Sequence, residues 1–244
     1  LRLVGSEMCI RDRWPDRDHA PHAGQFFTLR SWGADEAPFL SRPISVHRWN
    51  PDSSTIEFLY QVVGEGTEKL AQLKQRDTFQ LTGPMGNGFD VPDIVSKYKK
   101  IAVVGGGIGT APMFQLTREL AAAGVKPDVF FGFRDTPYCM EEYRSIANLV
   151  KVSTDTGAVG FHGFVTQLYD PADYDVVLVC GPTVMMKNAA RLCAEKGTPC
   201  FVSMEKKMAC GIGACLGCTC ETKGGEGKSV CKNGPVFDAT EVFF

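Results

Sequence analysis

Four cysteines near the C-terminal end of the chain have a spacing that suits a metal cluster. Cys210, Cys215, Cys218 and Cys231 follow the pattern C-x4-C-x2-C, with the fourth cysteine after twelve further residues. Thiolates at this spacing are typical of a plant-type [2Fe–2S] cluster, in which they hold two irons. Glycines between the first three cysteines permit the close backbone approach that such a loop needs. The segment therefore predicts a carrier of single electrons.

A structural zinc site is the alternative interpretation of these cysteines. Structural zinc sites usually combine two C-x2-C pairs, whereas this segment contains one such pair. The uneven spacing therefore favours the iron–sulfur cluster. Cys220 is a fifth cysteine in the same segment and could compete with Cys218 as a ligand. We assign Cys218, because the C-x4-C-x2-C pattern requires it.

A glycine-rich turn lies in the middle of the chain, between an apolar run and a helical pattern. It consists of Gly105, Gly106, Gly107, Ile108, Gly109 and Thr110. Backbone amides and the positive end of the following helix favour a phosphate or pyrophosphate there. The turn departs from the G-x-G-x-x-G fingerprint, because Thr110 occupies the third glycine position. No clear acidic residue ends the next strand, Asp135 being the nearest candidate, so an ordinary tight strand-to-helix connection is the alternative.

A second turn follows the last long apolar run of the chain. It consists of Cys180, Gly181 and Pro182. The carboxyl end of such a strand is the edge where α/β sheets bind ligands. The alternative is a buried cysteine followed by a chain-breaking turn.

Two short motifs in the first third of the chain offer groups that suit phosphate. The first offers a guanidinium beside a hydroxyl and consists of Arg42, Pro43, Ile44 and Ser45. Its alternative is a solvent-facing arginine before a strand. The second motif, Gly64-Glu65-Gly66-Thr67, lies where a strand meets a helix. We expect Thr67 to cap this helix, with the neighbouring amides available to a phosphate.

Two different folds must position these motifs. Residues 24–90 contain short β-branched and aromatic runs between turn clusters, with one helix from Thr67 to about Lys74. This pattern predicts a compact antiparallel β barrel. After Lys100, buried apolar runs alternate with helical patterns, which predicts a parallel α/β sheet. The fold class is therefore a β barrel plus an α/β domain, followed by a small loop-rich lobe around the cysteines.

We expect three domains behind a short leader. Residues 14–96 form the barrel, residues 97–200 the α/β domain and residues 201–244 the cysteine lobe. Residues 1–13 have neither the apolar core of a signal peptide nor an amphipathic period. They resemble a translated sequencing adaptor, so we expect a non-native leader that removes or replaces the first barrel strand. Cys9 lies in this leader and is not counted as a functional thiol.

Composition restricts the function and the compartment. The net charge of −2 and the pI of about 6.1 give no electrostatic footprint for nucleic acid. No apolar run reaches membrane-spanning length. Five of the ten cysteines lie within residues 210–231, which favours metal ligands in a reducing compartment, the cytoplasm, over a disulfide framework.

The histidines do not form a ligand or triad spacing. We therefore assign no catalytic acid or base and expect surface or turn positions for His19, His22, His47 and His162.

The order of the motifs resembles the ferredoxin–NADP reductase superfamily. RPIS and GEGT fall in the barrel, GPMGNGF at its exit, GGGIGTAP in the nucleotide domain and CGP before the last helix. With the segment ACGIGACLGC…CKNGPVF, the chain resembles one branch, the electron-transfer subunits of type B dihydroorotate dehydrogenase. The resemblance extends from about Gly24 to Phe244.

The resemblance implies three sites. FAD would contact Arg42, Pro43, Ile44, Ser45, Leu59, Tyr60, Gln61, Gly66 and Thr67. NAD would contact residues 105–110 and 180–182. The cluster would be held by Cys210, Cys215, Cys218 and Cys231. Nicotinamide exchanges two electrons at once and the cluster exchanges one, so a flavin must lie between them.

The resemblance also implies a partner. A (β/α)8 barrel for FMN and dihydroorotate needs roughly 200 residues more than these domains leave. Dihydroorotate oxidation would therefore belong to an FMN-containing catalytic subunit, in a heterotetramer of two plus two that serves pyrimidine (UMP) biosynthesis. Three alternatives remain: a related NAD(P)H-dependent reductase subunit for a hydrogenase, ferredoxin or oxygenase; a redox-sensing module; and a zinc-stabilised binding protein.

Overall fold

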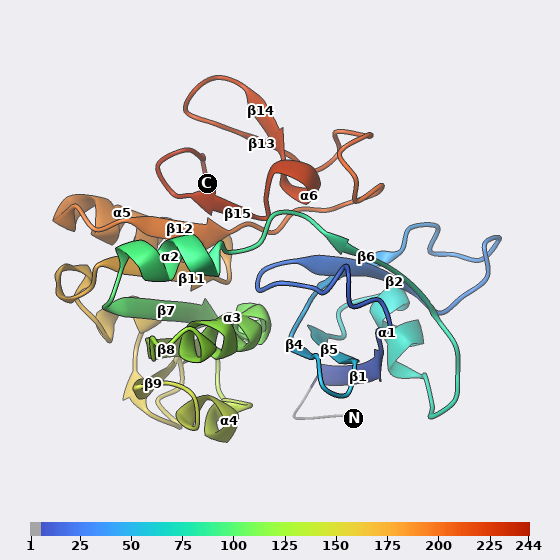
Figure 1. Cartoon of the computed structure of the whole chain (residues 1–244), viewed down its shortest axis with the longest axis horizontal. Helices are drawn as coiled ribbons and strands as arrows, with labels where there is room; N and C mark the ends of the chain where they lie inside the picture. The colour runs from blue at the N-terminus through green and yellow to red at the C-terminus, as the bar shows by residue number, and fades with distance from the viewer. Residues whose placement is uncertain (1–5) are drawn as a thin grey trace.

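The structure, a computed structural model, describes residues 6–244. Figure 1 shows a β-rich part on the right, a larger sheet with helices on the left, and a lobe at the top formed by the C-terminal residues. Within the described residues, no helix combines the length and the apolar character needed to cross a lipid bilayer.

Two three-stranded antiparallel sheets build the β-rich part. Their strand orders are β1-β5-β4 and β3-β2-β6, and they enclose a core that includes Phe27, Ile56 and Phe58. The predicted barrel is therefore confirmed. Its strands are β1 (Glu7–Arg13), β2 (Phe26–Arg30), β3 (Arg42–Ser45), β4 (Arg48–Asn50), β5 (Thr55–Gln61) and β6 (Gln80–Met85).

The predicted leader lies only partly within the described residues. Residues 1–5 are outside them, whereas β1 pairs with β5 along its whole length, from Glu7 opposite Gln61 to Arg13 opposite Thr55. This segment therefore supplies an edge strand of the barrel. Its non-native origin stays a prediction.

The barrel helix begins earlier than expected. α1 spans Glu65–Ala71 with Gly64 as its N-cap, whereas the sequence predicted a helix from Thr67 to about Lys74. The Thr67 hydroxyl accepts hydrogen bonds from the N–H groups of Val63 and Gly64, at 3.0 and 3.1 Å. Thr67 therefore stabilises the first turn from inside the helix rather than from the cap position.

A seven-stranded sheet forms the second domain, in the order β10-β9-β8-β7-β11-β12-β15. The first six of these strands are parallel and β15 is antiparallel to β12, so the predicted parallel α/β sheet is confirmed. The strands are β7 (Ile101–Gly106), β8 (Asp128–Phe133), β9 (Leu149–Thr154), β10 (Phe161–His162), β11 (Val176–Cys180), β12 (Cys200–Ser203) and β15 (Val236–Asp238).

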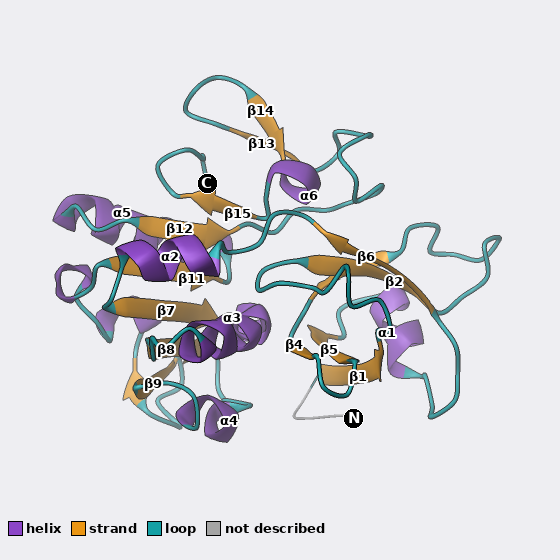
Figure 2. Ribbon diagram, in the orientation of Figure 1, coloured by secondary structure: helices purple, strands orange, loops and turns teal. Residues whose placement is uncertain are grey.

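Helices cover both faces of this sheet (Figure 2). Alternate strand residues share a core with α2 and α3 on one face, as Val103 and Val129 do, and with α5 on the other, as Val104 and Val177 do. This double burial explains why the strands read as continuous apolar runs. The helices are α2 (Val91–Lys97), α3 (Thr110–Ala122), α4 (Met140–Arg144) and α5 (Thr183–Lys196), with short 3-10 turns η1 (Gly107–Gly109), η2 (Val165–Gln167) and η3 (Pro171–Asp173).

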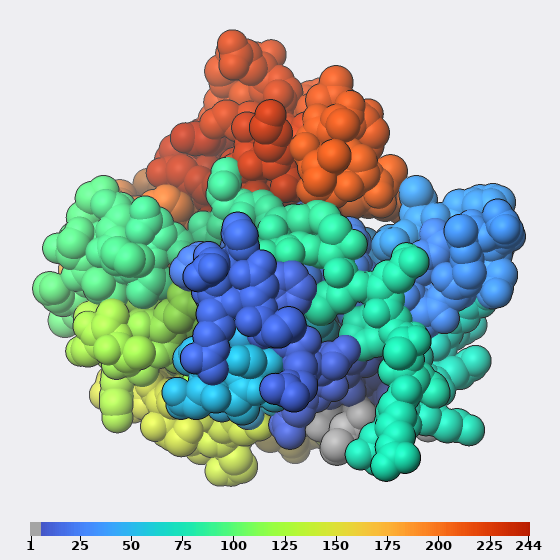
Figure 3. Space-filling view, turned by 45° about the vertical axis from the view of Figure 1, so that its right-hand side comes forward, coloured from blue at the N-terminus to red at the C-terminus, as the bar shows by residue number. Residues whose placement is uncertain are grey.

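The C-terminal lobe is joined to the large sheet. It contains the hairpin β13 (Thr219–Glu221) and β14 (Gly227–Ser229), followed by α6 (Val230–Asn233), before β15 returns to β12. The predicted boundary after residue 200 therefore falls inside β12. Figure 3 shows the lobe, in orange and red, as a cap on one end of the molecule.

Candidate functional site

The four predicted ligand cysteines gather in the C-terminal lobe. Backbone N–H groups point at their sulfur atoms, from Gly213 to Cys231 at 3.1 Å and from Cys231 to Cys218 at 3.4 Å. Cys210 accepts in the same way from the N–H of Cys215, also at 3.4 Å. Such N–H contacts stabilise thiolate charge and tune a cluster.

Electrostatics divide these thiols into two pairs. N–H groups of Cys215 and Ile212 lower the pKa of the Cys210 thiol to about 6, and the Cys215 thiol contributes a further hydrogen bond. Burial raises the pKa of Cys231 to about 11, and a hydrogen bond from Cys218 adds to this. Cys210 thus pairs with Cys215, and Cys231 pairs with Cys218.

This arrangement fits two metal ions better than one. A single tetrahedral zinc with Zn–S distances of about 2.3 Å would bring all four sulfur atoms to about 3.8 Å from one another. Across residues 6–244, no three of these sulfur atoms lie mutually within 4.8 Å. Two thiol pairs, one for each iron, are what a [2Fe–2S] cluster requires.

The fifth cysteine of the lobe points elsewhere. The Cys220 thiol donates to the carbonyl oxygen of Lys228 at 3.4 Å, across the β13–β14 hairpin. Cys218, in contrast, accepts the N–H of Cys231. The geometry therefore supports Cys218 as the ligand, as the spacing predicted.

Two separate segments of the barrel meet at Arg42, which begins β3. Its Nη2 donates to the carbonyl of Leu40 at 2.5 Å. Gly66 in α1 lies so close that a Cβ there would be 2.8 Å from Arg42 Nε. The glycine therefore creates the space in which the guanidinium lies against the start of α1.

Two polar atoms of the predicted FAD residues are buried without a hydrogen-bond partner among the described residues, Arg42 Nε and Tyr60 Oη. Burial also raises the pKa of Tyr60 well above its usual value, so the phenol stays a donor. Unpaired buried donors indicate a missing acceptor. Phosphate and flavin oxygens are acceptors, so these residues fit the FAD that the resemblance implies.

The strand β5 carries its predicted site residues to the junction of the two domains. Ile56, Phe58 and Tyr60 face the barrel core, while Leu59 belongs to the core that contains Val103 of β7. Leu59, Tyr60 and Gln61 thus end β5 beside the α/β domain, whose turn η1 contacts β5.

The two glycine-containing turns of the α/β domain come together at the end of the sheet. Cys180 of β11 lies opposite Gly105 of β7 in register. A Cβ on Gly109 would be 2.5 Å from the Cα of Gly181, and one on Gly106 would be 3.0 Å from Pro182. Only glycine permits this contact. Strands depart from β7 in both directions here, so the turns lie at the switch point where α/β sheets bind ligands.

Two tyrosines that no sequence motif indicated support this turn. Tyr138 Oη donates to the carbonyl of Gly107 at 2.7 Å, and Tyr143 Oη donates to that of Thr110 at 2.5 Å. Asp135, the acidic candidate after β8, accepts from the Thr156 hydroxyl at 2.8 Å. Its role toward a ribose stays a prediction.

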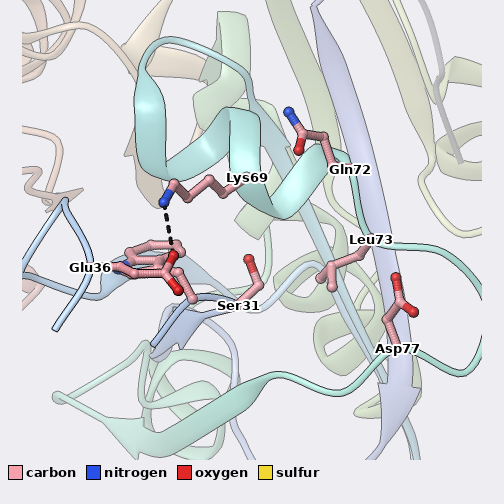
Figure 4. Close-up of a pocket in the computed structure, with 7 residues that line it drawn as sticks. Ser31, Glu36, Lys69, Gln72, Leu73 and Asp77 are labelled. Atoms are coloured by element: carbon pink, nitrogen blue, oxygen red, sulfur yellow. Dashed lines mark hydrogen bonds and ion pairs between the residues drawn. The ribbon is translucent and has the colours of Figure 1, made fainter. Parts of the chain in front are cut away.

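A cavity of about 320 Å³ lies beside the Arg42 segment, between α1 and the loop after β2. Figure 4 shows Lys69 of α1 reaching across it to Glu36, at 3.3 Å. The guanidinium of Arg42 lies 6.0 Å from the ring centroid of Trp32, which also lines the cavity. The cavity lining itself carries one lysine and two carboxylates, Glu36 and Asp77, so the positive charge in this region stays with Arg42.

The prediction for His47 was wrong in one respect. It lies in the short connection between β3 and β4, but it is buried and bonded through Nδ1 to the carbonyl of Ala111 at 2.7 Å. Packing between the barrel and α3 covers it, which no local pattern around residue 47 reveals.

The fold and these sites define a ferredoxin reductase-like protein with an added iron–sulfur loop. A protein-family model described as "Iron-sulfur cluster binding domain of dihydroorotate dehydrogenase B" matches residues 205–243. A relative from Clostridium acetobutylicum, "Dihydroorotate dehydrogenase B (NAD(+)), electron transfer subunit", is 47% identical over 90% of this chain and 85% of its own length. A protein of the same name from Clostridium perfringens is 43% identical over 91% and 87%. The chain belongs to this family of electron transfer subunits.

Solved structures agree with the fold. The NADH-dependent reduced ferredoxin-NADP oxidoreductase aligns with a TM-score of 0.87 and 27% identity, over 100% of this chain and 87% of that one. The ferredoxin reductase of carbazole 1,9a-dioxygenase aligns with a TM-score of 0.63 and 20% identity, over 82% and 64%. The second likeness concerns the fold alone.

Proposed function

We propose that this chain passes electrons between a dihydroorotate-oxidising flavoprotein and NAD⁺, through a [2Fe–2S] cluster and FAD, in pyrimidine (UMP) biosynthesis. Its relatives carry the name of this electron transfer subunit. Bound FAD would exchange electron pairs with nicotinamide and single electrons with the cluster. The chain's own residues bind and position these groups.

One observation supports this relay most strongly: the cluster loop packs on the barrel next to the FAD segment. A Cβ on Gly211 would be 2.7 Å from Met85 Sδ and 3.6 Å from the side chain of Thr28. Thr28 lies directly opposite Pro43 in the β2–β3 pair. The cluster loop is therefore one strand away from the residues proposed to hold FAD.

The connection between lobe and barrel is also hydrogen-bonded. The Asn87 side chain, just after β6, donates to the carbonyls of Lys232 and Asn233 at 3.0 and 3.2 Å. Its backbone N–H donates to Gly234. These contacts hold the ligand Cys231 at a fixed distance from the barrel.

The exposed side of the cluster loop is the proposed docking surface for the partner. Ile212 and Leu216 are each 65% exposed there; Leu216 directly follows the proposed ligand Cys215, and Ile212 lies two residues after Cys210. The partner is proposed to be the FMN-containing catalytic subunit, in a complex of two such subunits and two of these chains. Electrons would enter through the thiolates closest to this surface.

Reconstitution tests the proposal. The chain, with FAD and cluster intact, is mixed with the purified catalytic subunit, and NADH formation from dihydroorotate and NAD⁺ is followed. We expect NADH only when both proteins are present. A partner that reduces an artificial acceptor with dihydroorotate, but never NAD⁺ in the presence of this chain, would contradict the proposal.

A second function is favoured by one observation, the TM-score of 0.87 with the ferredoxin-NADP oxidoreductase. In that case the chain would pass electrons between NAD(P)H and a ferredoxin. Rapid ferredoxin reduction by NAD(P)H without NAD⁺-coupled dihydroorotate oxidation would identify it.

A further inference from the structure

Three side chains that none of the sites above uses meet where the barrel adjoins the α/β domain. His47 lies between β3 and β4, Cys139 is the N-cap of α4, and Glu142 lies in its first turn. A ring nitrogen, the Sγ atom and a carboxylate oxygen all lie within 4.8 Å of one another. Nitrogen, thiolate sulfur and carboxylate oxygen are the donors that zinc binds in proteins.

The hydrogen bond made by His47 fixes which of its ring nitrogens could bind a metal. Its Nδ1 lies 2.7 Å from the carbonyl oxygen of Ala111. A carbonyl can only accept, so Nδ1 carries the hydrogen and Nε2 carries the lone pair. Metal-binding histidines typically donate their other N–H in this way, which fixes the ring and its tautomer. Burial lowers the pKa of His47 and so favours the neutral imidazole.

Cys139 is held in an uncommon conformation that directs it to the same place. Its φ is 61°, in the left-handed region that residues other than glycine rarely adopt. Its Sγ atom lies within 4.8 Å of a Glu142 carboxylate oxygen. Burial, together with this carboxylate, raises the pKa of Cys139 to about 12. The thiol is therefore protonated in the absence of a metal, whereas a bound cation would favour the thiolate.

The charges around these three side chains are mixed. Arg48 Nη2 donates to one oxygen of Glu142 at 2.8 Å, and Arg48 Nε lies 3.8 Å from Glu57. Thiolate and carboxylate together would neutralise a doubly charged ion, whereas Glu57 lies between two arginines, 2.8 Å from Arg11 and 3.8 Å from Arg48. A cavity of about 320 Å³, lined in part by Glu142, Arg48 and Arg118, opens beside these three side chains.

We propose that His47, Cys139 and Glu142 bind a zinc ion that joins the barrel to the α/β domain, with water as the fourth ligand. On binding, Zn²⁺ displaces the thiol proton of Cys139 and releases it to solvent, while the imidazole and the carboxylate lose no proton. The site is independent of the proposed function. Because Tyr143 of the same helix donates to Thr110, the ion would also fasten the segment that supports the glycine-rich turn.

Zinc binding to the intact protein tests this inference. The chain with FAD and its iron–sulfur cluster is dialysed against EDTA and then equilibrated with zinc chloride, and zinc and iron are measured by mass spectrometry. We expect about one zinc per chain beside the iron, with one sulfur ligand by X-ray absorption. We also expect a higher melting temperature.

Variants decide which residues bind the ion. Cys139→Ser and Glu142→Gln should each weaken zinc affinity at least about tenfold, since even indirect partners of a metal contribute that much. Glu141→Gln removes the same charge one position away and should leave affinity unchanged. The inference is overturned if the protein binds no zinc, if both ligand variants bind it as well as the unaltered chain, or if the zinc has four sulfur ligands.

Discussion

Among single residues, Cys218 and Cys220 pose the sharpest question, because they differ by two positions and both are buried. Cys218 pairs with Cys231, whereas Cys220 bonds across its hairpin to Lys228. We expect Cys218→Ser to lose the cluster iron and acid-labile sulfide and Cys220→Ser to retain both. Chemical analysis of anaerobically purified variants measures this. Loss in Cys220→Ser alone would show that Cys220 is the ligand, and equal loss in both variants would contradict the choice of Cys218 over Cys220.

His47 makes stability depend on pH. Burial lowers its folded-state pKa below the ordinary 6.5, so below that pH the unfolded chain binds a proton that the folded chain excludes. Stability should therefore fall as the pH decreases through the region below 6.5. His47→Gln should remove up to about 1.4 kcal/mol per pH unit of this dependence.

Thermal melting in EDTA at several pH values measures the difference, which corresponds to a few degrees, about 2–4 °C per kcal/mol. His162→Gln, a change at an exposed histidine, serves as the control. An unchanged pH dependence in His47→Gln would mean that other groups cause it.

At the scale of elements, the start of α1 offers two glycines with opposite expectations. A Cβ on Gly66 would collide with Arg42, whereas a Cβ on Gly64 would meet nothing within 4 Å. Gly64 has an extended φ of 176°, which any residue adopts. Gly66→Ala should therefore displace Arg42 and reduce the FAD content of the purified protein several-fold, while Gly64→Ala keeps it. Full FAD content in Gly66→Ala would show that FAD binding does not depend on the position of Arg42.

The contact between the two turns of the α/β domain predicts a defect limited to the nucleotide. Gly109→Ala would force apart Gly109 and the Cys180–Gly181 backbone. We expect flavin reduction by NADH to require at least about tenfold more NADH, a loss of about 1.4 kcal/mol of binding. FAD and iron content should stay normal.

Gly224→Ala, in an open position of the C-terminal lobe, is the matched control. Unchanged NADH dependence in Gly109→Ala would place the nucleotide elsewhere.

The elements also show what the sequence could predict. Turn and strand patterns sufficed for the barrel and the parallel sheet, whereas the meeting of Gly105 with Cys180 follows from the register of β7 and β11, which the resemblance alone implied. The start of α1 was mispredicted, because Thr67 caps from within the helix. The proximity of His47, Cys139 and Glu142 was missed, since only the packing of two domains brings these residues together.

At the scale of the whole molecule, electron transfer requires three sites to follow one another in space. They are the turns at the end of β7 and β11, the Arg42 region of the barrel, and the cysteine loop. β5 connects the first two through Leu59, and β2 connects the second to the third through Thr28. The C-terminal lobe is anchored on both sides, to β12 by β15 and to the barrel by Asn87. The lobe is therefore expected to keep the cluster near the flavin without a domain movement.

Anaerobic titration of the purified chain with NADH, monitored by visible absorption alongside iron and sulfide analysis, tests the relay most directly. We predict a brown protein with about two irons per chain, in which NADH bleaches the flavin and then the cluster, to a total of about three electrons. A colourless protein containing zinc in place of iron, or a cluster that stays oxidised while the flavin is fully reduced, would contradict the account.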